Sequence, residues 1–418
     1  MGTLVGIWAL RRPWLLDGPE TLFLRRALAL QLTLAVVIFI ALYVVAGQEV
    51  TSDVPGYYMP DARAVIAGQV PGKDFAQSYA PLFPYIGAVL LSVWNSGKIY
   101  ALAAIAFNAI ALAFWHATAR ATYDLAVARR ATILYASSGP ALLQVLLGTQ
   151  QVWIAAALAA SACLLIRGRS FASGGAQALA AAITKVLAGL FWPVLWICAP
   201  GRLRWLAAVV LLDGMVYGAF ALAGAHPLQA LQREGDLHTS GNLPYLLEPL
   251  WATSARSHLL SDSVAAAVLL CALTWLYLQA RLLPSQRRSQ LVLSGLSFIG
   301  LLFMLVSKKS PPAYAVFFLY PAIVMCVLGL RSLRVQSWFL FGFNLLLVLE
   351  PALWVRVGNW RSLSDWLALA RGTGAGFIAV ELMLLAGYGL LAWQSAVHIL
   401  KVRAAPERSM PELSIHAA

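Results

Sequence analysis

The stretch ALALQLTLAVVIFIALYVVAG, residues 27–47, decides the fold class of this chain. It holds no charged residue, and its most polar side chains are Gln31 and Thr33. A helix that crosses a bilayer needs about 20 mostly apolar residues, so this run is long enough to span a membrane. It is too long for the core of a signal peptide, and no small-residue cleavage site follows it. We therefore expect a membrane helix that the protein retains.

The composition of the whole chain indicates the same class. Of its 418 residues, 61% are hydrophobic and 11% are charged, whereas soluble globular proteins carry roughly 25% charge. The four cysteines, Cys163, Cys198, Cys271 and Cys326, all fall in apolar runs, where free thiols behave as small hydrophobic groups. We predict an all-α polytopic membrane protein without a disulfide framework or a metal cluster.

The net charge of +13 is distributed in short basic clusters between apolar runs rather than along one face. This pattern indicates membrane topology and no nucleic-acid partner, because cytoplasmic loops carry an excess of Lys and Arg. Basic residues at 11, 12, 25 and 26 place residues 1–26 in the cytoplasm as an N-terminal segment. Residues 401–418 are predicted to form a cytoplasmic tail. The charge pattern thus predicts an integral membrane protein whose first loop, with Asp53, faces the side away from the cytoplasm.

Apolar runs between the basic clusters predict one transmembrane domain over residues 27–400. The predicted crossings are 27–47, 99–118, 131–148, 151–166, 205–225, 263–281, 290–306, 315–330, 336–353 and 374–397. The stretch from Arg169 to Arg202 begins and ends at cytoplasmic clusters, so it must cross twice. We expect two short helices broken near Thr184-Lys185, which gives about 12 crossings. Short or broken helices are tolerated where they line a cavity inside the protein.

The run from Pro81 to Trp94 is apolar but short, and it begins with two prolines, Pro81 and Pro84. A full crossing here would move every later basic cluster to the other side of the membrane. We prefer a re-entrant or interfacial helix, and a crossing stays open as the alternative. The predicted external loops are 48–98, 226–262, 307–314 and 354–373, and the first of them should contain interfacial helices.

The first loop contains the acidic stretch TSDVPGYYMPDARAVIAGQVPGKDFAQSYAPLFPY, residues 51–85. The order Asp53-x-x-x-Tyr57, Gly68-Gln69-Val70-Pro71, Asp74-Phe75 and Tyr79-Ala80-Pro81-Leu82 resembles the first external loop of membrane glycosyltransferases of the GT-C superfamily. In style it is most similar to the polyprenyl-phosphate-mannose-dependent group that includes bacterial alpha-1,2-mannosyltransferases (glycosyltransferase family 87). The family pattern has Tyr-Pro-Pro-Leu where this chain has Tyr-Ala-Pro-Leu, and Lys73 shifts the spacing.

Later segments resemble the same superfamily: the Pro140 to Gly148 region, the short helix reaching Lys185, and Ser307-Lys308-Lys309 followed by Tyr314 and Pro321. The resemblance implies a GT-C fold and transfer of a sugar, mannose or a similar hexose or pentose, from a polyprenyl-phosphate donor. The acceptor would be a lipid-linked or cell-envelope glycan on the external face, and the anomeric centre would be inverted. Membrane lipids are the other expected partners.

Asp53, at the point where the first helix leaves the membrane, is the predicted general base. A hydroxyl is a weak nucleophile, so a carboxylate must accept its proton during attack. The residue pattern alone equally allows a turn or helix cap, because Ser52-Asp53 precedes Val54-Pro55. Asp61, after Pro60, is expected to cap an interfacial helix. Asp74 is expected to order the loop or bind the acceptor.

Three lysines are predicted to bind the phosphate of the donor: Lys308, Lys309 and Lys185. Lysine provides a point charge suited to phosphate, and it would stabilise the leaving group as its charge grows. Lys308 and Lys309 lie on the predicted outer side, and snorkelling to lipid headgroups is their alternative role. Lys185 lies between apolar helices, which makes it a functional candidate. Its alternative is a buried pair with an acid such as Asp213, Glu350 or Glu381.

The residues predicted to bind the acceptor or the sugar are Tyr57, Tyr58, Asp74, Tyr79, His238, Asn242 and Tyr245. Trp251 is a further aromatic candidate. The alternative for these aromatic residues is the general enrichment of Tyr and Trp at membrane interfaces. Neutral amides stand at Gln150 and Gln151 in the next external turn, where metal-dependent GT-C enzymes carry acids. Amides are poor ligands for a hard cation, so we predict no metal and no cofactor.

Two other classes of function stay open. A transporter or flippase of lipid-linked sugars would also be polytopic, basic inside and rich in broken helices, but the two halves of the chain show no internal repeat. A non-catalytic assembly subunit with a GT-C-like fold would tolerate changes at Asp53. Replacement of Asp53 by Asn separates both alternatives from an enzyme.

Overall fold

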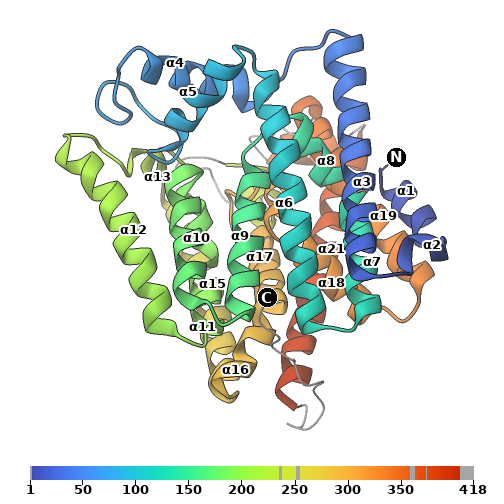
Figure 1. The fold of residues 1–418 in the computed structure, drawn as a ribbon. Helices are drawn as coiled ribbons and strands as arrows, with labels where there is room; N and C mark the ends of the chain where they lie inside the picture. Colours follow the sequence, from blue (N-terminus) through green and yellow to red (C-terminus); the bar gives the residue numbers. More distant parts are fainter. Residues whose placement is uncertain (1, 235–237, 251–254, 358–362, 373, 405–418) are drawn as a thin grey trace.

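The computed structural model describes residues 2–234, 238–250, 255–357, 363–372 and 374–404, and every regular element in these ranges is helical. Eight helical stretches there are long and apolar enough to cross a membrane (Figure 1). They are Glu20–Val45 (α3 and η1), Lys98–Thr122 (α6), Arg202–Leu222 (α12), Leu259–Arg281 (within α15, Ala255–Arg281), Ser285–Val306 (α16, η5 and α17), Pro312–Gly329 (η6 and α18), Leu333–Val357 (α19) and Ala375–Ala404 (α21). The prediction of an all-α polytopic membrane protein is confirmed.

Shorter helices pack among these long ones. They are α7 (Leu125–Ala136), α8 (Gly139–Leu146), α9 (Gln151–Ile166), α10 (Ser170–Ile183), η3 (Val186–Phe191) and α11 (Trp192–Cys198). The predicted crossing 131–148 is therefore two helices, separated at Ser137-Ser138 before Pro140. α10 ends at Ile183, and Thr184 and Lys185 lie between it and η3. The predicted break at Thr184-Lys185 is confirmed.

The segment between α3 and α6 starts and ends on one side of the bundle, which we call the loop end. Lys98 Nζ lies 3.2 Å from the Glu49 carboxylate and donates to the Tyr43 carbonyl at 3.3 Å. Between them lie η2 (Val54–Tyr58), α4 (Met59–Ile66) and α5 (Phe83–Val93). α5 has 11 residues, a length of about 16 Å, which is too short to span a bilayer. It lies beside α4 in Figure 1, so residues 81–94 contain a short helix that does not span a bilayer on its own, and the preferred re-entrant or interfacial placement in a membrane stays a prediction.

The opposite side of the bundle, which we call the basic end, carries the turns that follow α6, α9, α11, α15 and α18, and the C-terminal turns of α21 (Figure 1). The predicted cytoplasmic clusters of Arg and Lys occupy these turns. Arg403 donates to the Gln279 side chain at 3.1 Å, and Arg287 donates to the Val402 carbonyl at 3.1 Å. The ends of α15 and α21 are thereby joined.

The N-terminal segment differs from its predicted extent. α3 begins at Glu20, before the predicted boundary between residues 26 and 27, and Glu20 is held by Arg129 at 2.9 Å and by His116. The preceding helix α1 (Gly2–Ala9) packs against α7, α8 and α19. Gly6 faces Ser137, where a β-carbon would lie 2.0 Å from the Ser137 hydroxyl. Residues 2–9 are therefore part of the helical bundle.

Two predicted external loops also contain helix. α15 begins at Ala255, inside the predicted loop 226–262, and α20 (Leu363–Arg371) lies inside the predicted loop 354–373. α4 begins at Met59 with Pro60 in its first turn, so Asp61 lies within that turn rather than before it. The expected capping position of Asp61 was wrong, because the helix starts two residues earlier than the Pro60-Asp61 pattern indicated.

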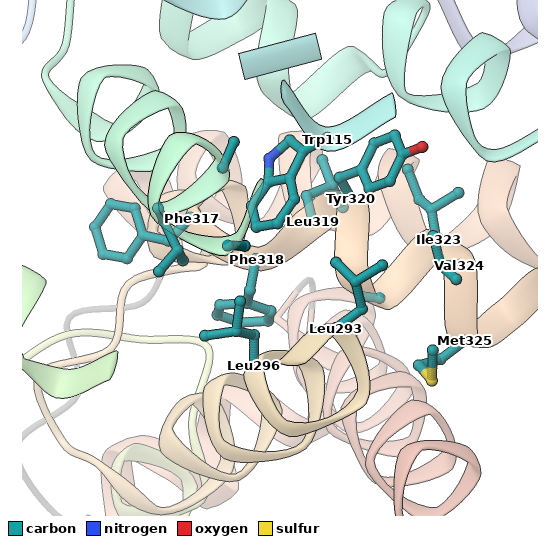
Figure 2. Packing of buried hydrophobic residues seen from close by; sticks show 14 of the residues in the cluster. Trp115, Leu293, Leu296, Phe317, Phe318, Leu319, Tyr320, Ile323, Val324 and Met325 are labelled. Atoms are coloured by element: carbon teal, nitrogen blue, oxygen red, sulfur yellow. The ribbon is translucent and has the colours of Figure 1, made fainter. Parts of the chain in front are cut away.

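The core between α6, α17 and α18 anchors the segment that leads to the loop end. Figure 2 shows Trp115, Phe318 and Tyr320 packed together, and the Trp115 and Tyr320 rings are stacked with centroids 5.7 Å apart. The Phe318 ring lies against Gly300, where a β-carbon would approach it to 2.4 Å. This close contact fixes η6, and η6 carries Tyr314.

Candidate functional site

The side chain of Asp53 is engaged by Tyr79 at the loop end. The Tyr79 hydroxyl donates to Asp53 Oδ2 at 2.8 Å. Asp53 precedes η2, but its side chain makes no capping hydrogen bond to that helix. The turn-cap alternative therefore does not describe its carboxylate. Ser52, just before it, has φ +70°, a left-handed conformation that costs energy for a residue other than glycine.

Lys185 lies against the same tyrosine. Its Nζ lies 5.0 Å from the centre of the Tyr79 ring and 5.5 Å from that of Tyr314, and it donates to the Tyr314 hydroxyl at 3.3 Å. Only 9% of Lys185 is exposed. An ammonium over aromatic faces is attracted by their quadrupoles, and more strongly when it is removed from water. Tyr79 thus contacts both the Asp53 carboxylate of the first loop and the Lys185 ammonium at the break between α10 and η3.

The chain around Tyr79 explains this placement. Ala80 N donates to the Thr184 carbonyl, and Leu82 N donates to the Ala182 carbonyl, both at 3.0 Å. The loop therefore runs along the end of α10 and satisfies carbonyls that the helix leaves unpaired. Burial raises the pKa of Tyr79 far above its usual range, and the nearby Tyr58 and Asp53 add to this effect. Tyr79 therefore remains a protonated donor.

Two neighbouring cavities extend from this cluster and share Val186 and Leu231 as wall residues. The first touches Tyr79 and Lys185 and has a volume of about 10 Å³, room for about one water molecule. The second has a volume of about 250 Å³, and its wall is apolar except for Ser307 and Lys309. A sugar does not fit in the first cavity as it stands, whereas the second resembles a site for an apolar chain with one cation.

Lys308 and Lys309 have different surroundings. Lys308 is 5% exposed, and its Nζ lies 2.9 Å from Asp262, a partner that the sequence analysis missed. Lys309 lies farther from the same carboxylate, at 3.9 Å, and lines the larger cavity. The Lys308 carbonyl also accepts from Thr239 N at 2.9 Å. Of the two, Lys309 is the one directed to a space that could hold a ligand.

Asp74 orders its own loop. Its Oδ2 accepts from Val70 N at 2.7 Å, which agrees with the first of the two predicted roles. The same loop docks on the segment after α12: His226 N donates to the Gly72 carbonyl at 2.8 Å, and Gln77 bonds to Gln229 and to the Pro227 carbonyl, both at 3.2 Å. The first loop and the start of the predicted loop 226–262, which we call the second loop, therefore meet beside the cluster, where Ala230 and Leu231 line the small cavity.

The predicted aromatic residues of the first loop have distinct roles. Tyr58 is 1% exposed and packs edge-on against Tyr79, with ring centres 4.9 Å apart. It supports Tyr79 and offers little surface to a ligand. Tyr57 is 49% exposed, and its ring centre lies 6.3 Å from that of Tyr79. Tyr57 is thus the exposed aromatic surface beside the cluster.

His238, Asn242 and Tyr245 belong to a second cluster. Asn242 caps α14 (Leu243–Leu247), where its Oδ1 accepts from Tyr245 N at 3.0 Å. His238 lies 3.7 Å from Glu248, and Tyr245 packs edge-on against Phe377 of α21, with ring centres 6.4 Å apart. Through these contacts the three residues hold the second loop against the bundle. Trp251 lies outside the described residues.

The turn Gly148–Gln151 lies under Tyr58. Gln150 N donates to the Tyr58 hydroxyl at 3.4 Å, while both polar atoms of the Gln150 side chain are buried without a hydrogen-bond partner. Gly148 has φ +64°, and a β-carbon there would lie 3.1 Å from Tyr100 Cβ. Across the described ranges, no three His, Cys, Asp or Glu side chains gather closely enough to hold a metal ion.

A scan against models of known protein families and a search of curated proteins both give no match for this chain. The class that the fold defines is an all-α polytopic membrane protein. At its loop end an acid, a tyrosine and a lysine meet beside an apolar cavity.

Proposed function

We propose that this protein is a membrane glycosyltransferase of the GT-C type that takes its sugar from a polyprenyl-phosphate donor. One observation carries the proposal: Tyr79 contacts both the Asp53 carboxylate and the Lys185 ammonium, next to a cavity with an apolar wall and Lys309. The reaction needs a base for the proton of the acceptor, a cation for the phosphate of the donor, and an apolar space for its lipid chain. The resemblance of residues 53–82 to the superfamily is the second support.

In the proposed reaction, the acceptor hydroxyl attacks the anomeric carbon of the sugar, and its proton passes to Asp53. The bond from the anomeric carbon to the phosphate oxygen breaks, and the polyprenyl phosphate leaves with the electron pair. Attack opposite the leaving group inverts the anomeric centre. Lys185 and Lys309 would stabilise the charge that grows on the phosphate. Lys308 would keep Lys309 in place through their shared partner Asp262.

The proposed topology has 12 crossings within a GT-C fold. The short helices α9, α10 and η3 with α11 would each cross once, α7 with α8 would form one further crossing, and the eight long stretches would supply the rest. The basic end would face the cytoplasm of a bacterium, since Arg and Lys accumulate there. The loop end, with Asp53, would then lie on the periplasmic side of the inner membrane.

The test is sugar transfer by purified protein from a panel of synthetic polyprenyl-phosphate sugars, with and without EDTA. Wild type should transfer one sugar class, and Asp53→Asn should lose the activity while keeping its expression level. Glu49→Gln is the matched control, because Glu49 lies in the same loop with a 75% exposed side chain. Equal activity of wild type and Asp53→Asn would refute the role of Asp53. Lipid movement in vesicles without transfer would favour a transporter.

A further inference from the structure

A further cavity lies away from Asp53, at the basic end. It has a volume of about 280 Å³ and is formed by the C-terminal parts of α18 and α21. None of the residues that the proposed reaction uses lines it. Its place near Lys401, where the helices approach their basic turns, puts it close to the boundary of the membrane.

One face of α21 gives this cavity its polar groups. Gln394, His398 and Lys401 follow one another at intervals of four and three residues, so their side chains lie on the same side of the helix. All three line the cavity. Gln394 Oε1 and His398 Nε2 are buried and have no hydrogen-bond partner within the described chain. Buried polar atoms are nearly always bonded in native proteins, so these two atoms indicate a missing partner.

The rest of the cavity wall is apolar, from Met325, which is 1% exposed, to residues at the surface of the bundle. Leu328 and Val397 contribute to it, and Leu390 and Trp393 are 40% and 68% exposed. Tryptophan prefers the interface between membrane and water, where its ring has an apolar body and a polar edge. The cavity therefore combines a lipid-facing wall with polar groups that lead to a cation.

Lys401 is the cationic side chain in the wall of this cavity. Its neighbours Arg403 and Arg287 already donate to Gln279 and to the Val402 carbonyl. An anionic headgroup would meet Lys401 at the mouth and the neutral groups of Gln394 and His398 deeper inside. Basic pockets between membrane helices are recognised sites for anionic lipid headgroups.

We propose that this cavity binds an anionic glycerophospholipid whose headgroup carries hydroxyl groups, as phosphatidylglycerol does. The phosphate would pair with Lys401. A headgroup hydroxyl would donate to Gln394 Oε1, and His398 Nε2 would complete the hydrogen bonds. One acyl chain would lie along Leu390, Trp393 and Val397. This site is independent of the proposed sugar transfer and is separated from it by the bundle.

The test is native mass spectrometry of the full chain in detergent with dioleoyl phosphatidylglycerol or dioleoyl phosphatidylcholine. Wild type should retain phosphatidylglycerol about fivefold better, and Lys401→Ala should remove that preference, which is the effect of one basic residue near an anionic lipid. Arg334→Ala is the control, because Arg334 is an exposed base at the same end that does not line the cavity. An equal decrease in both variants, or no preference in wild type, would overturn the proposal.

A second comparison tests the hydroxyl contact. Phosphatidic acid keeps the phosphate but lacks the headgroup glycerol, so Gln394→Leu should lower retention of phosphatidylglycerol to the level of phosphatidic acid. Unchanged retention in Gln394→Leu would contradict the assignment of that atom. Excess soluble glycerol 3-phosphate should leave the lipid bound, since the apolar wall contributes to affinity. Displacement by it would instead mean a site for a soluble phosphate.

Discussion

The Tyr79 hydroxyl donates to the Asp53 carboxylate at 2.8 Å while its ring faces Lys185 Nζ at 5.0 Å. One side chain thus orients both charged groups of the candidate site. Because the pKa of Tyr79 is raised by burial, the hydroxyl keeps its proton at any physiological pH. In the proposed reaction, the other carboxylate oxygen of Asp53 would accept the proton of the acceptor hydroxyl.

Tyr79→Phe should lower kcat for sugar transfer by about 10- to 100-fold, because a hydrogen bond to a charged group contributes about 1.5–3 kcal/mol. The ring, and with it the contact with Lys185, is retained. Tyr57→Phe is the matched control, since Tyr57 is half exposed and contacts Tyr79 only through its ring. Initial rates with saturating donor measure the effect. Equal rates for Tyr79→Phe and wild type would remove Tyr79 from the mechanism.

Lys185→Met should raise KM for the polyprenyl-phosphate sugar and lower kcat, each by roughly tenfold, since one charged partner of the phosphate is lost. Methionine fills a similar space between the two tyrosines. Lys73→Met, in the exposed turn of the first loop, is the control and should behave as wild type. If Lys185→Met changes only the thermal midpoint of unfolding and no kinetic constant, Lys185 has a structural role between its aromatic neighbours.

Lys309→Ala should raise the donor KM by about fivefold, whereas Lys308→Ala should alter it less than twofold. The difference follows from geometry, because Lys309 lines the apolar cavity and Lys308 is paired with Asp262 at 2.9 Å. Donor saturation curves for the two variants at one ionic strength make the comparison. A larger effect from Lys308 than from Lys309 would reverse the proposed roles.

Gly72→Ala should destabilise the docked loops by about 1–2 kcal/mol, because Gly72 has φ +75° and its β-carbon would lie 3.1 Å from the His226 carbonyl oxygen. Gly68→Ala separates the two causes, since Gly68 has φ +83° but no atom within 4 Å of a β-carbon. Limited proteolysis between residues 70 and 80 reports the loosening. Equal cleavage of the two variants would mean that backbone strain, not contact with His226, sets the cost.

Much of the path of the chain could be predicted from charge and hydropathy. The break at Thr184-Lys185 followed from two basic clusters that had to share one side, and the short helix within 81–94 followed from its prolines and its length. The packing of α1 could not be foreseen. It depends on contacts with residues far away in the sequence, such as Ser137, which Gly6 faces. The short apolar run before Arg11 and Arg12 gives no sign of these contacts. Local pattern carries no information about such a contact.

The residues of the candidate site could be predicted from local pattern, but their contacts with one another could not. Asp53, Tyr79 and Lys185 were each singled out by residue type and motif, but their contact depends on how residues 80–82 run along the end of α10. Asp262 was missed because a lone acid near the start of a helix has no distinguishing pattern. Asn242 was assigned to a ligand although its side chain caps α14, because capping and sugar binding favour the same amide.

The cavity of about 10 Å³ between Tyr79 and Lys185 has one further consequence for an enzyme of the proposed kind. A glycosyl donor exposed to bulk water would lose its sugar to hydrolysis, since water competes with the acceptor for the same carbon. A space with room for about one water molecule, lined by residues of both loops, would admit little of that competitor, and the loops, joined at Gly72 and His226, would have to part for a substrate to enter. The fidelity of transfer would then depend on how briefly those loops part.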